Sequence, residues 1–246
     1  MSHNLNFIQK LPKQASLIKV TLYNPNPSTS MTYPTTVSSI PKPVSEDHIT
    51  QYIRIRLAAL KTNPEAFGST HAGESAFSRE QWCGRINNPA RTTLFAIPTP
   101  FTLADASLQR DAVSQPDDHA SKWIGTLSVL GPEMLCGAPF PPKIAEAKQR
   151  GDAEIYMLTG MWVDPEVRKK GVGRQLVEHA SQIVRDFSVI NNDWNIKGDV
   201  GRQNFFLLLE VHKDNFEAER LYESLGFVEE FGGAKEGRKW MALNIR

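Results

Sequence analysis

The chain has 246 residues, 40% of them hydrophobic, which suits one large domain or one domain with extensions. Its 28 basic and 27 acidic side chains give a formal net charge of +1, which excludes a strongly basic nucleic-acid-binding surface over the whole chain. No apolar run approaches the ~18 residues of a membrane span, and Cys83 and Cys136 lack the spacing of a metal site or a disulfide framework.

The N-terminal residues 1–44 are predicted to be an extension outside the folded domain. Residues 15–23 have the pattern of a strand. Residues 24–44 contain five prolines and eight serines or threonines in 21 positions, which leaves few apolar residues for a core. We therefore expect 24–44 to be a flexible arm or loop, and 45–246 to be the folded domain.

Two helices are predicted next. The first begins at Ser45, whose side chain can cap it, and ends at Asn63-Pro64. The second is short and begins at Ser78, which forms a capping box with Gln81.

Strands and helices alternate over the remainder of the chain. Strands are predicted over 92–97, 123–130, 155–163, 205–211, 227–231 and 239–245. Helices are predicted over 171–187 and from a cap at Asp214 or Asn215 to Gly226, with polar segments at 99–121, 132–152 (including a short helix near 144–149) and 188–203. This pattern predicts an α/β or mixed α+β fold.

The segment Arg168–Arg174 combines two glycines, four basic side chains and the start of a predicted helix. Glycine allows close backbone approach, and a helix N-terminus offers unpaired N–H groups, so the segment suits a phosphate or pyrophosphate. A P-loop requires Gly-Lys-Ser/Thr, whereas Gly173 is followed by Arg174-Gln175. A dinucleotide fingerprint requires a third glycine where the chain has Leu176, so both motifs fit poorly.

The same segment resembles the acetyl-CoA-binding motif of the GNAT superfamily of N-acetyltransferases. Arg168, Gly171 and Gly173 occupy its Arg/Gln and glycine positions. A second family signature follows, carried by Asn215, Ala218, Leu221, Tyr222 and Leu225-Gly226-Phe227. The strong resemblance covers about 154–232, and a weaker one, to a subgroup of small acetyltransferases, covers 49–90.

The resemblance implies a twisted mixed central sheet, flanked by helices and splayed between its fourth strand (155–163) and fifth strand (205–212). It implies acetyl-CoA as the cofactor. The pantetheine arm would lie on the backbone of Met161, Trp162 and Val163. The cofactor-binding residues of the pyrophosphate loop would be Arg168, Lys169, Lys170, Gly171, Val172, Gly173 and Arg174. Asn215 would contact the cofactor, although a helix cap alone explains an asparagine there.

Acetyl transfer needs a neutral amine, a donor for the oxyanion and a proton for the departing thiolate. The resemblance places Tyr222 as the acid that protonates the thiolate and as a cofactor contact. Glu210, a carboxylate within an apolar strand, is the candidate base, because an unpaired charge there is costly. Glu154 or a chain of water molecules is the alternative base. Phe67, Trp82 and Trp162 would line an acceptor pocket or belong to the core.

We therefore expect an acetyl-CoA-dependent N-acetyltransferase that transfers acetyl directly to a primary amine on a small molecule or peptide. The alternatives are a peptide or protein N-terminal acetyltransferase and a non-catalytic acyl-CoA-binding regulatory module. No metal, nucleic acid or membrane is expected as a partner. The sequence leaves the oligomeric state open between a monomer and a homodimer, which the last strands often build in this family. The unpaired cysteines indicate a cytoplasmic location.

Overall fold

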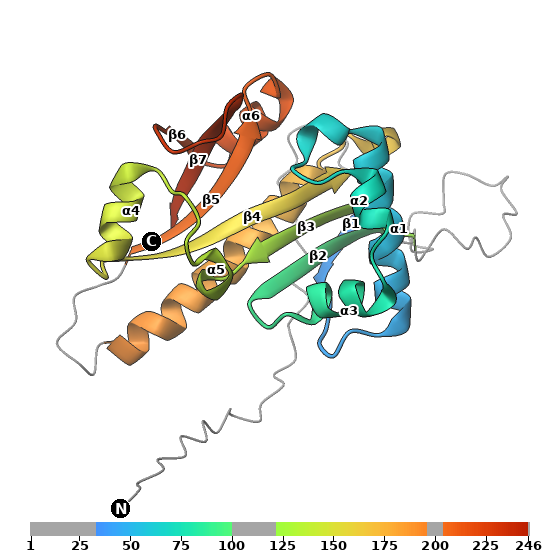
Figure 1. The fold of residues 1–246 in the computed structure, drawn as a ribbon, viewed down its shortest axis with the longest axis horizontal. Helices are drawn as coiled ribbons and strands as arrows, with labels where there is room; N and C mark the ends of the chain where they lie inside the picture. Colours follow the sequence, from blue (N-terminus) through green and yellow to red (C-terminus); the bar gives the residue numbers. More distant parts are fainter. Residues whose placement is uncertain (1–32, 100–121, 196–203, 246) are drawn as a thin grey trace, which may run out of the picture. The chain divides into compact units, whose positions relative to one another are not determined.

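A seven-stranded sheet organises the part of the chain that the structure describes. The structure is a computed structural model that describes residues 33–99, 122–195 and 204–245, all within the compact unit Met31–Arg246. The strand order is β1-β2-β3-β4-β5-β7-β6, and only the β4–β5 pair is parallel (Figure 1). The strands are β1 (Thr35–Ser39), β2 (Arg91–Pro98), β3 (Gly125–Leu130), β4 (Ala153–Val163), β5 (Asn204–His212), β6 (Val228–Glu230) and β7 (Arg238–Ile245).

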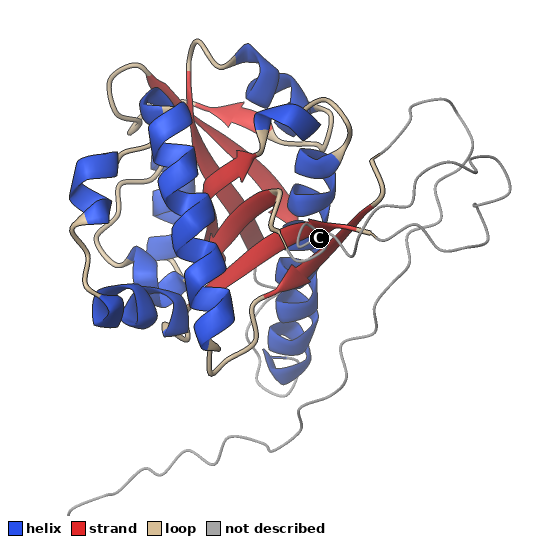
Figure 2. Cartoon of the chain, turned by 90° about the vertical axis from the view of Figure 1, so that its right-hand side faces the viewer, coloured by secondary structure: helices blue, strands red, loops and turns tan. Residues whose placement is uncertain are grey.

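Helices cover both faces of this sheet (Figure 2). They are α1 (Glu46–Thr62), α2 (His71–Ser75), α3 (Arg79–Asn87), α4 (Pro142–Gln149), α5 (Val172–Asn195) and α6 (Phe216–Glu223). The largest apolar cluster packs α5 and α6 against one face of the sheet. On the other face, a second cluster buries α1 and α3, and a third buries α4. This mixed α/β architecture confirms the predicted fold class.

The predicted helix caps are present in the structure. Ser45 accepts a hydrogen bond from the backbone N–H of His48, and α1 ends at Thr62. Ser78 and Gln81 form the capping box of α3. Asn215, rather than Asp214, caps α6 and accepts a hydrogen bond from a backbone N–H three residues later.

The prediction of a flexible arm over 24–44 is wrong for its C-terminal part. Strand β1 (Thr35–Ser39) lies there and pairs antiparallel with β2, from Thr35 opposite Pro98 to Ser39 opposite Leu94. The serine and threonine content suggested a loop, but threonine and valine are also favourable strand residues. Consequently, the sheet begins before Ser45. The strand predicted over 15–23 lies outside the described residues.

Two other segments differ from the prediction. The polar segment 188–203 was expected to be a loop, but α5 continues to Asn195, because no glycine or proline interrupts it and each added residue adds a helical hydrogen bond. The short helix α2 was not predicted. The segment 99–121 falls outside the described residues except for its first position. None of the described helices is long and apolar enough to cross a membrane.

Candidate functional site

Strands β4 and β5 separate halfway along their length. They pair from Ala153 opposite Asn204 to Met157 opposite Leu208. Beyond that point β4 continues to Val163 and β5 to His212 without pairing to each other, and the two strands diverge in Figure 1. The splayed sheet expected from the sequence is therefore present, and its opening lies beside residues 161–163.

A β-bulge in β4 sets the directions of the side chains at this opening. Thr126 lies opposite Trp162, whereas Ser128 lies opposite Thr159, so β4 contains one extra residue there. Gly160 has a φ of +66°, a conformation that glycine adopts without a steric penalty. After the bulge, Met161 and Val163 pack in the apolar cluster beneath α5 and α6, while Trp162 packs in the cluster beneath α1 and α3 on the other face.

The loop from Arg168 to the start of α5 has the backbone shape of an anion site. Lys169 and Gly171 have φ values of +62° and +88°. The first hydrogen bond of α5 runs from the N–H of Gln175 to the carbonyl of Gly171, at 3.1 Å. The N–H groups of α5 before Gln175 therefore have no carbonyl partner within the helix. Such N–H groups point along the helix axis and favour phosphate. The loop backbone therefore fits a pyrophosphate.

Gly173 permits the close packing of this loop on β4. A β carbon at Gly173 would lie 2.9 Å from Cε of Met161 and 3.4 Å from Cδ2 of Leu221. A larger residue would displace the Met161 side chain, so the glycine keeps α5 close to the diverging strands.

The Arg168 side chain forms hydrogen bonds with other residues of the protein. Its Nε donates to the carbonyl of Val163 at 2.9 Å, and its Nη2 donates to Oδ1 of Asn63 at 2.6 Å. Asn63 Oδ1 also accepts from Nε1 of Trp162 at 3.2 Å. The side-chain oxygen of Asn63 thus links the end of α1 to both β4 and the loop. Trp162 is a buried core residue that this hydrogen bond holds in place.

The other basic side chains of the loop also have protein partners. Lys169 forms a 2.8 Å ion pair with Glu217, and Nη2 of Arg174 donates to Oγ of Ser224 at 2.7 Å. The Nζ atom of Lys170 lies over the ring of Tyr33, 5.4 Å from its centroid. The backbone, more than the side chains, therefore supplies the candidate phosphate contacts.

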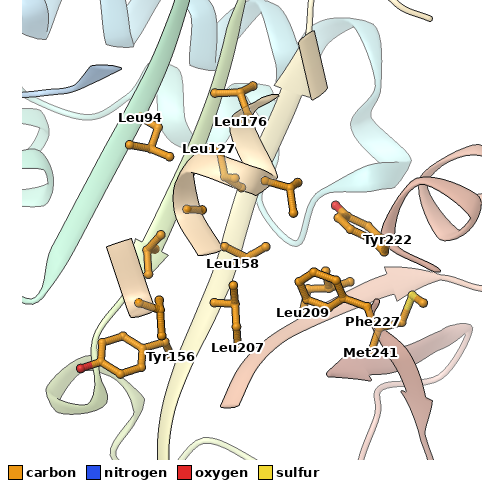
Figure 3. Close-up of a cluster of buried hydrophobic side chains, with 14 of the residues drawn as sticks. Leu94, Leu127, Tyr156, Leu158, Leu176, Leu207, Leu209, Tyr222, Phe227 and Met241 are labelled. Atoms are coloured by element: carbon orange, nitrogen blue, oxygen red, sulfur yellow. The ribbon is translucent and has the colours of Figure 1, made fainter. Parts of the chain in front are cut away.

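Tyr222 extends from α6 toward β4 (Figure 3). It is 7% exposed, and its hydroxyl donates to Sδ of Met161 at 3.2 Å. Its ring packs at a tilt against Phe227, with centroids 5.6 Å apart. Burial raises the pKa of Tyr222 well above its usual value, so the phenol stays protonated and able to donate at neutral pH.

Glu210 points to the opposite face of the sheet. Leu209 and Val211 pack in the cluster that contains Tyr222, so the alternation of β5 directs Glu210 away from it. Glu210 is half-buried, and Oε1 accepts from the N–H of Lys235 at 3.2 Å. Lys235 is one of the residues that line a surface hollow of ≈ 320 Å³, formed by Lys213 and residues 229–239.

The alternative base, Glu154, lies near the start of β4, opposite Phe205, at the end remote from the splay. Trp82 and Trp162 belong to the core that packs on α1, and Phe67 packs at its edge. No three histidine, cysteine, aspartate or glutamate side chains gather as a metal-binding group within the described ranges.

Sequence reasoning missed a buried ion-pair network. Arg56 of α1 donates to both carboxylate oxygens of Glu74 in α2, at 2.9 and 2.7 Å, and Arg85 of α3 contacts the same carboxylate at 3.1 Å. The signal for Arg56 was present, since it interrupts the apolar stripe of α1. Burial raises the pKa of Glu74, but the two guanidinium groups outweigh it and lower that pKa to about 2.

Comparisons with known proteins identify the class. Residues 143–229 match a family model described as an acetyltransferase (GNAT) domain. The match defines an acyltransferase domain that spans α4 to β6 and contains the splay, the loop and Tyr222. The matched segment contains both sequence signatures, and the match confirms the resemblance to the GNAT family that they predicted. A search of curated protein sequences finds no match.

Solved structures share the fold at low sequence identity. A crystal structure of Arabidopsis thaliana NAA60 in complex with acetyl-CoA is 13% identical, with a TM-score of 0.52, over 86% of this chain and 98% of that one. A GNAT-family acetyltransferase from Streptococcus pneumoniae is 16% identical, with a TM-score of 0.52, over 86% and 99%. One from Staphylococcus aureus Mu50 is 12% identical, with a TM-score of 0.50, over 86% and 99%.

Proposed function

We propose that this protein is an acetyl-CoA-dependent N-acetyltransferase that transfers acetyl directly to a primary amine. The observation that carries the proposal is the hydrogen bond from Tyr222 to Met161 at the opening between β4 and β5, within the segment that matches the acetyltransferase family. A buried, protonated phenol at this opening is suited to donate a proton to a departing thiolate.

Acetyl-CoA would lie between the two diverging strands. The backbone of Met161, Trp162 and Val163 would pair with the pantetheine arm. The loop amides at Val172, Gly173 and Arg174 would bind the pyrophosphate, supported by the helix dipole. Asn215 would act mainly as the cap of α6, because its side-chain oxygen already accepts from Ala218.

The reaction moves one acetyl group and one proton. The amine nitrogen forms a bond to the acetyl carbon, the carbon–sulfur bond breaks, and the amine loses a proton. Tyr222 would donate its proton to the thiolate. Glu210 would accept the amine proton from the other face of the sheet, directly or through water.

The first experiment measures release of free thiol from acetyl-CoA against a panel of small-molecule amines and peptides. We expect thiol release that depends on the amine, with mass spectrometry showing an amine product 42 Da heavier, the mass of an added acetyl group. Peptide hits without small-molecule hits would support the N-terminal acetyltransferase alternative. Binding of acetyl-CoA without transfer to any acceptor would support the regulatory-module alternative.

A thermal-shift control tests the acyl donor independently of the acceptor. Acetyl-CoA or CoA at a hundredfold excess over its dissociation constant should stabilise the protein by about 2.7 kcal/mol. NAD and ATP at the same concentrations should not. Equal shifts from ATP would remove the support for an acyl-CoA site.

The edge of the sheet supports a homodimer as part of this proposal. Val228 on the edge strand β6 and Phe231 just after it are 59% and 79% exposed, and two exposed apolar side chains so close in sequence can contribute to an interface. Both cysteines carry free thiols, which supports a cytoplasmic compartment. Sedimentation of the full chain at several concentrations tests the dimer.

A further inference from the structure

A strip of polar residues crosses the sheet on the face opposite α5. Thr93, Ser128 and Thr159 occupy paired positions on β2, β3 and β4, and the hydroxyls of Thr93 and Ser128 lie 3.1 Å apart. Thr159 lies two residues beyond the last paired residue of β4, and Glu210 lies two residues beyond its partner on β5. Thr159 and Glu210 therefore lie on the same face of the sheet, on the two sides of the opening. We call these four residues the polar strip.

A cluster of guanidinium groups accompanies the polar strip. Arg91 of β2 donates from Nη1 to Oγ of Ser128 at 3.2 Å. Arg56 and Arg85 share the carboxylate of Glu74, and all three groups act electrostatically on Arg91. Three positive charges thus face one negative charge, an excess of two. We call Arg56, Arg85 and Arg91 the guanidinium cluster.

Arg91 is incompletely satisfied. It is 7% exposed, and its Nε atom is buried without a hydrogen-bond partner among the described residues. Burial lowers the pKa of Arg91, which reflects the cost of holding this charge away from water. Excess buried charge is destabilising and tends to persist at sites where a ligand compensates it. The ligand group that matches a guanidinium in charge and shape is a carboxylate.

The cluster reaches the opening between the strands. Nη1 of Arg56 lies 3.7 Å from the position that a β carbon of Gly160 would occupy. Gly160 is the residue before Met161, whose sulfur accepts the Tyr222 hydrogen bond. The positive cluster therefore adjoins the bulge on the face that carries Glu210, while Tyr222 approaches the same bulge from the other face.

We propose that the acceptor is a small amine that also carries a carboxylate, and that the guanidinium cluster selects it. This inference rests on the proposed function, because it names the acceptor class of the same site. The carboxylate would offset the excess positive charge, and an amine without one would meet a repulsive field. Arg85, with a side chain that is 24% exposed, is the member that is accessible to solvent.

Matched acceptors test the proposal. Phenylalanine and phenethylamine differ by a carboxylate, as do leucine and 3-methylbutylamine. We measure kcat/KM for each with the full-length protein and saturating acetyl-CoA, expressed per neutral amine. The carboxylate-bearing member of each pair should be preferred by at least about tenfold, the low end for a hydrogen bond to a charged group.

Three variants separate charge from shape. Arg85→Gln should lose most of the preference, and Arg85→Lys should retain most of it. Arg79→Gln removes the same charge from the same helix, but Arg79 pairs with Glu46 at the exposed N-terminal end of α3, so the preference should be unchanged. Circular dichroism and the thermal shift with acetyl-CoA confirm that each variant is folded and binds the donor.

The outcomes distinguish this inference from the proposed function. Equal or faster transfer to the amines without a carboxylate would overturn the inference while the proposed function stands. Equal losses of preference in Arg85→Lys and Arg85→Gln would also overturn it, because charge would not be the cause. Absence of both transfer and acetyl-CoA binding would overturn the proposed function itself.

Discussion

Acidification should destabilise the fold through Glu74. Although burial alone would raise the pKa of this carboxyl group, the hydrogen bonds and charge of Arg56, with the charge of Arg85, lower it from 4.5 to about 2. A carboxylate with a depressed folded-state pKa contributes stability that is fully present above the unfolded-state pKa. That stability is lost as the pH falls from about 5 to about 2.

The magnitude follows from the pKa difference. A shift of 2.5 pKa units, from 4.5 to about 2, corresponds to about 3 kcal/mol of unfolding free energy at 1.36 kcal/mol per unit. At pH 3, protonation of the unfolded state has lowered this contribution to the unfolding free energy by about 2 kcal/mol. The side chains of Arg56 and Glu74 are only 6% and 3% exposed, so water screens the pair weakly.

Urea unfolding of the wild-type protein and of Glu74→Gln, from pH 6 to pH 3, measures this contribution. Glutamine keeps the shape of the side chain but does not titrate. The variant should be less stable by about 3–5 kcal/mol at pH 6, because it leaves Arg56 buried without its charge partner. The difference should shrink by about 2 kcal/mol at pH 3.

Glu46→Gln is the matched control. Glu46 pairs with Arg79 at the surface, where its side chain is 81% exposed, and it should contribute less than about 1 kcal/mol at any pH. A constant difference between wild type and Glu74→Gln across this pH range would refute the reasoning, because the carboxylate would then not be held ionised by its arginine partners.

Three other substitutions or truncations test the site and the fold. Gly171→Val forces a branched residue into a φ of +88° and should abolish acetyl-CoA binding by calorimetry, whereas Gly137→Val, at a φ of +73° outside the site, should bind normally. Tyr222→Phe should lower kcat by about 10²-fold with little change in the KM for acetyl-CoA, and an unchanged kcat under conditions where chemistry limits the rate would leave Tyr222 as a packing residue. Removal of residues 1–30, outside the compact unit, should preserve the Tm, whereas removal of 1–44 deletes β1 and the buried Ile40 and should lower it sharply; equal Tm values would show that β1 is dispensable.

The features that were predictable from sequence are local. Ser45 and Ser78 cap helices through neighbouring backbone groups, and Gly171 adopts the positive φ that the loop motif requires. Each depends on a few consecutive residues, so one sequence contains the information. The order of strands and helices from residue 125 onward follows from the same short-range patterns of apolar residues.

The features that escaped prediction depend on contacts between distant segments. Glu74 lies in a five-residue helix, too short to form without tertiary packing, and its partner Arg56 is 18 residues away. Strand β1 is stabilised by pairing with β2, about 60 residues later, rather than by its own composition. The contact between Tyr222 and Met161 joins residues 61 positions apart, and the resemblance suggested the acid but not its sulfur partner.

The bulge at Gly160 has a consequence for the insertions and deletions that this chain can tolerate. Side chains alternate between the two faces of a strand, and β4 takes three residue steps from Thr159 to Trp162 where β3 takes two. Removing one residue here would leave two steps on each strand, so the ladder would become regular while Trp162 stayed opposite Thr126 and Met161 kept its face. Descendants of this sequence that lost the bulge would therefore keep the two faces of β4 and lose the local bend and twist that the bulge gives this strand at the opening.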